Sequence, residues 1–65
     1  MMNWIDIYDI AIALEEKNPT VDIININFID LRNLVLQLDG FDDAPNKCNE
    51  KILEAIQQAW LDERS

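Results

Sequence analysis

Two residues that interrupt helices, Pro19 and Gly40, divide the chain into three stretches whose apolar residues recur at helical spacing. Proline disfavours helical geometry in the residue before it, so a first helix that begins between Asn3 and Asp6 is expected to end before Asn18. Gly40 is the only glycine, and it stands where a left-handed residue commonly ends a helix. The sequence therefore predicts three helices.

The second helix is expected to run from residue 29 or 30 to residue 38 or 39. The third is expected to begin between Asp43 and Asn49, either of which could be its N-cap. Apolar residues at helical spacing give each helix one face for the core. These residues are Ile7, Ile10, Ala11, Leu14, Leu31, Leu34, Val35, Leu38, Ile52, Leu53, Ile56, Ala59 and Trp60. We expect a mainly α, compact three-helix domain.

The segment over residues 20–28 has a different pattern. Ile24, Ile26 and Phe28 alternate with asparagines, as in an extended segment or a short strand. A single short strand has no obvious partner elsewhere in the chain. We therefore expect a connecting segment that places Ile24 or Ile26, together with Phe28, in the core.

The first helix carries a further, partly apolar stripe of Ile5, Tyr8 and Ile12. Either this helix is buried on more than one side, or Tyr8 and Ile12 are exposed for a partner. Trp4 and Trp60 are interpreted as anchors of the core or its edge.

The whole chain, residues 1–65, is expected to form a single domain. A domain of this size buries only about 60% of its unfolded surface. With 49% apolar residues, the chain has enough side chains for one small core. It has no room for a cofactor cleft together with a catalytic apparatus, so we expect that it is not an enzyme.

Acidic residues dominate the charge, with 13 acids against 5 bases, no histidine and a net charge of −8. Nucleic-acid binding normally requires a basic surface, which argues against it here. An acidic domain is suited to a partner with a basic patch. The charge could instead serve only to keep a small protein soluble.

Cys48 is the only cysteine, which excludes an intramolecular disulfide and a thiolate zinc site. The N-terminal residues lack the pattern of a signal peptide, and no apolar run is long enough to span a bilayer. We expect a cytoplasmic monomer that contacts no membrane and holds no tightly bound cofactor.

The first candidate site is acidic. Asp42 and Asp43 stand on a predicted loop, and Glu50 and Glu54 lie one turn apart on the third helix. Such carboxylates can meet a basic partner, or hold a divalent cation weakly and with little selectivity. Alternatively, Asp43 caps the helix and the glutamates complement its dipole.

A second acidic stripe comprises Asp6, Asp9 and Glu16, with Asp22 on the turn that follows. It is either a second part of the site or a plain solvated face. Lysines interspersed in the first cluster partly neutralise it, which argues against a dedicated high-affinity metal site.

Two C-terminal runs are more specific, namely FDDAPNKCNEKILEAI at residues 41–56 and WLDE at residues 60–63. They closely resemble the IscX (YfhJ) family of bacterial iron–sulfur cluster assembly. The resemblance covers essentially the whole chain. Upstream, the residues that fit the family are Trp4, Asp6, Ile10, Leu14, Pro19, Asp22, Phe28, Asp30 and Leu31.

The resemblance implies a small winged-helix-like fold that does not bind DNA. It implies a non-enzymatic accessory whose acidic face docks on a basic patch of the cysteine desulfurase, a patch that frataxin also uses, and modulates the enzyme. The partner-binding residues would be Asp42, Asp43, Glu50, Glu54, Asp6 and Asp9. Weak ferrous iron binding is also implied, through Asp42, Asp43, Glu50, Glu54 and Asp22. The alternative is a carrier that delivers ferrous iron to the assembly machinery.

Three departures from the family pattern bear on iron. Ala44 stands where a third consecutive acid is usual, Thr20 where an acid commonly follows the turn proline, and Arg32 where a histidine is typical. Each removes an acid or an imidazole ligand. They weaken the case for iron more than the case for docking, which tolerates the loss of single charges.

Overall fold

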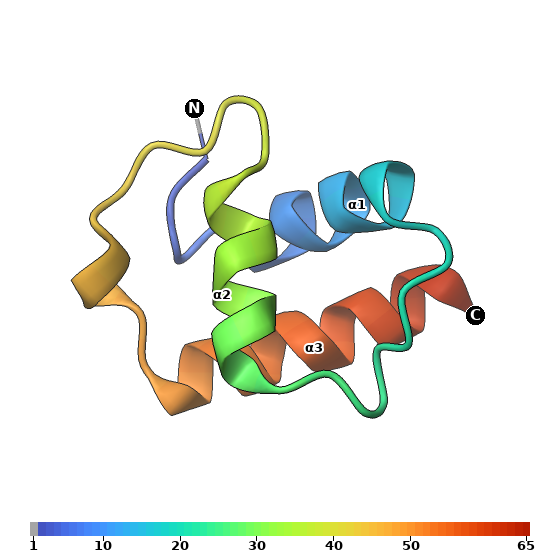
Figure 1. Cartoon of the computed structure of the whole chain (residues 1–65). Coiled ribbons are helices and arrows are strands. Elements are labelled where there is room, and N and C mark those ends of the chain that lie inside the picture. The colour runs from blue at the N-terminus through green and yellow to red at the C-terminus, as the bar shows by residue number, and fades with distance from the viewer. Residues whose placement is uncertain (1) are drawn as a thin grey trace.

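The computed structural model describes residues 2–65 and consists of three α-helices and one short 3-10 helix (Figure 1). The α-helices are α1 (Ile7–Lys17), α2 (Phe28–Leu36) and α3 (Glu50–Arg64), and the 3-10 helix is η1 (Pro45–Lys47). The prediction of a mainly α, three-helix domain is confirmed. Across residues 2–65, β pairing is limited to one parallel bridge between Met2 and Phe41. The likeness to a winged helix remains an expectation.

Asparagine side chains begin two of the helices. The Asn27 carbonyl accepts the backbone N–H of Asp30 at 2.8 Å, and the Asn49 carbonyl accepts that of Ile52 at 2.9 Å. Each bond satisfies a backbone donor that the first turn of a helix leaves without a partner. Asn49 is therefore the N-cap of α3, and the alternative cap Asp43 has another role.

Gly40 has the left-handed backbone expected of it, with φ of 82°, but it does not cap α2 directly. The helix ends at Leu36, about two residues earlier than predicted. Gly40 instead occupies the third position of a turn that the N–H of Phe41 closes by donating to the carbonyl of Leu38 at 3.2 Å. This is where a type II turn requires positive φ.

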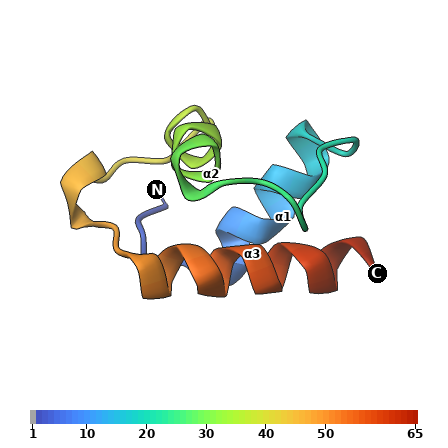
Figure 2. The same cartoon turned by 60° about the horizontal axis from the view of Figure 1, so that its bottom comes forward.

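The helices enclose one core. α1 and α2 lie on the same side of α3 (Figure 2), and the faces predicted from helical spacing point inward. The fully buried residues include both tryptophans, as expected, and one residue that was not predicted, Ile23. The buried core residues are Trp4, Ile10, Ala11, Leu14, Ile23, Leu31, Val35, Leu38, Leu53, Ile56, Ala59 and Trp60.

The connection between α1 and α2 differs from the prediction in its choice of buried isoleucine. Ile24 is 73% exposed, while Ile23 takes the core position and Ile26 and Phe28 are partly buried against it. The reason is that the segment is a series of turns rather than an extended strand, so alternation does not decide which side chains face inward. The carbonyl of Ile23 is fixed by the side-chain amide of Gln57, which donates to it at 2.8 Å.

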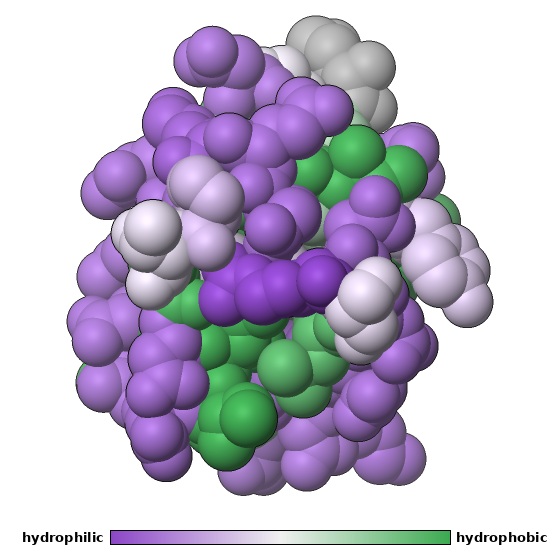
Figure 3. All heavy atoms as spheres, turned by 90° about the vertical axis from the view of Figure 1, so that its right-hand side faces the viewer, coloured by the Kyte–Doolittle hydropathy of each residue, from purple (hydrophilic) through white to green (hydrophobic). Residues whose placement is uncertain are grey.

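A polar network joins the carboxyl end of α3 to α1. The Glu15 carboxylate accepts the indole N–H of Trp60 and the Nε–H of Arg64, both at 2.9 Å. The Arg64 guanidinium also donates to the carbonyls of Asn18 and Val21, in the connection between α1 and α2. Figure 3 views this end of the molecule, where polar side chains cover most of the face and apolar ones gather in two areas, below the centre and toward the upper right. Among the described helices, none combines the length and apolarity that crossing a membrane requires.

Candidate docking surface

The acidic turn is built on the first residues of the chain. The N–H of Met2 donates to the carbonyl of Gly40 at 2.8 Å, and the N–H of Asp42 donates to the carbonyl of Met2, also at 2.8 Å. These two bonds form the Met2–Phe41 bridge and bring Trp4 against Phe41, with ring centroids 4.8 Å apart in an edge-to-face arrangement. The turn is therefore attached to the core rather than projecting as a free loop.

Asp43 is committed to this attachment. One carboxylate oxygen accepts the backbone N–H of Ala44 at 2.8 Å, and the other accepts that of Trp4 at 3.3 Å. The Trp4 indole N–H in turn donates to the carbonyl of Ala44 at 2.8 Å, and Lys47 lies 3.7 Å from the carboxylate. The side chain is only 18% exposed. Asp43 therefore acts first as a structural residue of the turn.

The hydrogen bond from the Ala44 N–H, followed by that from the Trp4 N–H, lowers the pKa of Asp43 below its usual value. Backbone donors favour the charged carboxylate over the protonated one. The turn thus carries a fixed negative charge at neutral pH.

Asp42 has the opposite environment. Its side chain is exposed, and no side-chain hydrogen bond or ion pair is found for it among residues 2–65. Asp6 follows Trp4 by two residues, and its carboxylate accepts the N–H of Asn3 at 3.0 Å. The N-terminal segment thus joins Asp6, which belongs to the second predicted stripe, to the turn at Asp42 and Asp43.

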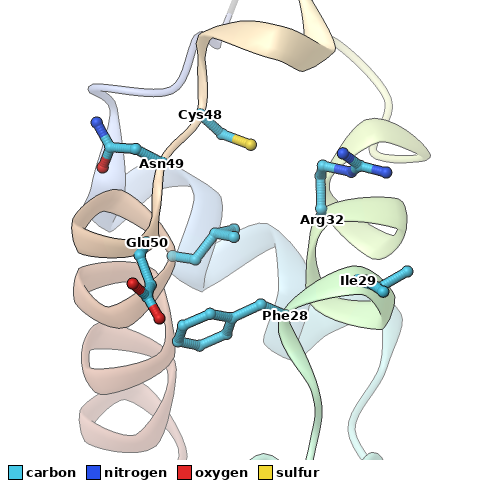
Figure 4. A pocket seen from close by; sticks show the side chains of 7 residues that line it. Phe28, Ile29, Arg32, Cys48, Asn49 and Glu50 are labelled. Atoms are coloured by element: carbon cyan, nitrogen blue, oxygen red, sulfur yellow. The ribbon is translucent and has the colours of Figure 1, made fainter.

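Glu50 and Glu54 are exposed on the first turns of α3. Glu50 forms one wall of a pocket of about 210 Å³ between α2 and the start of α3 (Figure 4). Arg32 lies across this pocket, and its Nε is buried without a hydrogen-bond partner among residues 2–65. Glu50 and Arg32 line opposite sides of this pocket, and Glu54 is not one of its lining residues.

Cys48 also lines this pocket and is partly buried. Its thiol donates to the carbonyl of Pro45 at 3.3 Å, which closes η1. The side chain thus contributes to the local structure that leads into α3.

The two remaining predicted residues lie apart from the turn. Asp9 is exposed on α1. Asp22 lies in the connection between α1 and α2, where its carboxylate accepts from the side chain of Asn25 at 2.8 Å and its pKa is lowered, first by that bond. The neighbouring Ile23 contacts Gln57, about 10 Å further along α3 than Glu50. Asp22 is therefore separated from the glutamates at the start of α3.

The part of the chain that the structure describes contains no group of three or more histidine, cysteine, aspartate or glutamate side chains placed to hold a metal ion. The predicted residues are spread over several elements, namely the N-terminal segment, α1, the connection between α1 and α2, the acidic turn and the start of α3.

Sequence reasoning missed one surface feature beside these acids. A groove of about 350 Å³ runs between α1 and α3, with Tyr8 on one side and Asp62 and Gln58 on the other. The exposed stripe of Tyr8 and Ile12 was a visible signal for it. The contribution of α3 was not visible, because it depends on how the two helices pack.

Comparison with known proteins agrees with the motif. A family model described as iron-sulphur cluster assembly matches residues 2–65. An uncharacterized protein of Pseudomonas aeruginosa is 49% identical over 63 residues, which cover 97% of this chain and 96% of that protein. The resemblance predicted from the C-terminal runs is confirmed, and the chain belongs to the iron-sulphur cluster assembly family.

Proposed function

We propose that the protein is a non-enzymatic adaptor of iron–sulfur cluster assembly, which docks by its acidic surface on a basic patch of the cysteine desulfurase and modulates that enzyme. The observation that carries this proposal is that the two acids of the turn, Asp43 and Asp42, have different roles. Asp43 is held by internal hydrogen bonds, and the neighbouring Asp42 carboxylate is exposed and has no side-chain partner within residues 2–65.

Docking by such a surface has a physical basis in charge. The net charge of −8 attracts a basic partner over a distance, and exposed carboxylates at Asp42, Glu50 and Glu54 can pair with its arginines and lysines. Glu50 and Glu54 repel one another when alone, because they are four residues apart on one helix. A basic partner relieves that repulsion.

The test is a titration of the protein with the cysteine desulfurase at increasing salt. We expect binding at low salt that weakens steeply as salt rises, because exposed charges are screened beyond about 10 Å at 0.1 M ionic strength. Calorimetry would give the affinity, and desulfurase turnover would report modulation. Absence of binding at low salt, or binding indifferent to salt, would contradict the proposal.

A matched pair of variants locates the surface. Glu54→Lys and Glu63→Lys make the same change in net charge on the same helix, with both side chains exposed. Position 54 belongs to the proposed surface, while position 63 lies about 13 Å further along α3. Glu54→Lys should weaken binding about tenfold and Glu63→Lys only slightly. Equal effects would mean that net charge alone matters.

Ferrous iron is the second ligand to test, as cargo rather than as a resident cofactor. Exposed carboxylates without imidazole or thiolate partners would bind it weakly. Titration with ferrous iron, followed by aspartate and glutamate resonances, separates the adaptor from the carrier. Gradual changes in the millimolar range support the adaptor, and saturation at low stoichiometry supports the carrier.

A further inference from the structure

The second surface of interest is an exposed apolar stripe on α1. Tyr8 on α1 and Ile5 in the turn before α1 are each 78% exposed, and Ile12, one turn beyond Tyr8, is 42% exposed. Large apolar side chains at this spacing on one side of a helix are unusual on the surface of an isolated domain. Nothing within residues 2–65 covers them.

This stripe borders a hollow rather than a flat face. Tyr8 lines the groove of about 350 Å³ between α1 and α3, and the floor is apolar or small on both helices. The complete lining is Ile7, Tyr8, Ala55, Gln58, Ala59 and Asp62. Two alanines on α3 leave room beside the tyrosine ring. A groove between two helices with an aromatic side chain at its edge suits the insertion of an apolar side chain.

Among the residues that line the groove, the only charged one is acidic. Asp62 lines it, and Asp9, next to Tyr8 in the chain, is exposed. A second copy of this chain would bring a net charge of −8 and the same acids to the contact, so like charges would oppose self-association. An anionic membrane surface is opposed in the same way. The complementary occupant is therefore basic as well as apolar.

We propose that this groove binds an amphipathic helix of a partner protein, which inserts an apolar side chain beside Tyr8 and places lysines or arginines against Asp62. Helix-in-groove binding of this kind uses apolar anchors at i, i+3, i+4 and i+7, and Tyr8 and Ile12 continue the apolar contact along α1. The surface is separate from the acidic turn at Asp42, and the proposal holds whichever protein docks on that turn.

The test uses a synthetic 14-residue helical peptide with leucines on one face and lysines on the other. Titrated into the ¹⁵N-labelled protein, it should shift the amide resonances of Tyr8, Ala55, Gln58, Ala59 and Asp62. A second peptide of equal charge, with serines in place of the leucines, should bind at least tenfold more weakly. If both peptides bind equally, or the shifts centre on Asp42, the proposal is wrong.

A matched pair of variants tests the tyrosine. Tyr8→Ser should weaken binding of the leucine peptide about tenfold, whereas Ile24→Ser, at a 73% exposed position that does not line the groove, should leave it unchanged. Because both side chains are exposed, both variants should keep the wild-type Tm, which checks that the fold is intact. Equal weakening by the two variants, or none by Tyr8→Ser, would overturn the proposal.

Discussion

Two corners of the molecule each hold a buried tryptophan, but they use their acidic residues differently. Trp60 donates to the carboxylate of Glu15, which also binds the cation Arg64. Trp4 donates to a backbone carbonyl, and the carboxylate beside it, Asp43, is satisfied by backbone N–H groups. The first corner joins two helices through side chains, and the second joins a chain end to a turn through the backbone.

The difference shows which acids are available to a partner. At the Trp60 corner the charge of Glu15 is balanced by Arg64, 2.9 Å away, so this carboxylate is not available to a basic partner. At the Trp4 corner the charge of Asp43 is balanced mainly by dipoles, with Lys47 further away at 3.7 Å. That corner therefore keeps its negative potential, which Asp42 increases.

The largest expected effect is at the Trp60 corner. Arg64→Ala removes the donor to Glu15 and to the carbonyls of Asn18 and Val21. It should lower the free energy of unfolding by about 2–3 kcal/mol, since hydrogen bonds to charged groups are worth about 1.5–3 kcal/mol. Urea unfolding followed by circular dichroism measures this free energy.

The control is Lys51→Ala, which changes an exposed basic residue on the same helix. It should change stability by less than about 0.5 kcal/mol. Similar losses of stability in the two variants would mean that the loss does not come from the hydrogen bonds of Arg64.

A smaller effect is expected at the turn that leads to the Trp4 corner. Gly40→Ala places a Cβ at φ of 82°, where no atom lies within 4 Å, so the cost is backbone strain and not a clash. The left-handed conformation costs about 1–2 kcal/mol for an ordinary residue. Thermal unfolding would show the loss, and Gly40→Asn should recover part of it, because asparagine tolerates this conformation. An unchanged Tm for Gly40→Ala would show that the turn can adopt another backbone.

The smallest effect is expected for Asp43→Asn, and it depends on pH. The folded pKa of Asp43 is lowered, so its carboxylate stabilises the fold above the unfolded pKa of about 3.9, and this contribution is lost as pH falls through the folded pKa. The variant should be slightly less stable than the wild type at pH 7, and the two should converge in acid. Tm measured from pH 7 down to pH 2 tests this.

Asp22→Asn is the control for this measurement. The pKa of Asp22 is also lowered, but its main partner is Asn25 within a local turn. Asp22→Asn should change the Tm in the acid range, but it should leave the contacts of Trp4 unchanged. A constant difference between Asp43→Asn and the wild type at every pH would contradict the linkage to the carboxylate.

The sequence predicted those features that local signals determine. Proline at position 19 and asparagine at position 49 set helix ends through contacts within a few residues, and both ends appear where expected. Periodicity likewise identified the buried faces of the helices. The family motif gave the assignment to iron–sulfur cluster assembly.

What the sequence did not predict depends on contacts between distant residues. Asp43 looked like a helix cap, but its partner Trp4 lies 39 positions away. Glu15 and Trp60 are 45 positions apart, and no local pattern links them. Ile23 rather than Ile24 is buried, in a segment of turns whose Ile23 carbonyl accepts from Gln57, 34 positions away. The division of the acids into structural and exposed members follows from these contacts.

The burial of both tryptophans has a spectroscopic consequence. Each indole is shielded from water, yet one lies beside the acidic turn and the other beside a carboxylate at the far end of α3. In Trp60→Phe the remaining indole, Trp4, is a fluorophore next to the proposed desulfurase contact, and in Trp4→Phe the remaining indole reports from the opposite corner. The protein therefore contains its own pair of optical probes, one for partner binding and one for the integrity of the fold.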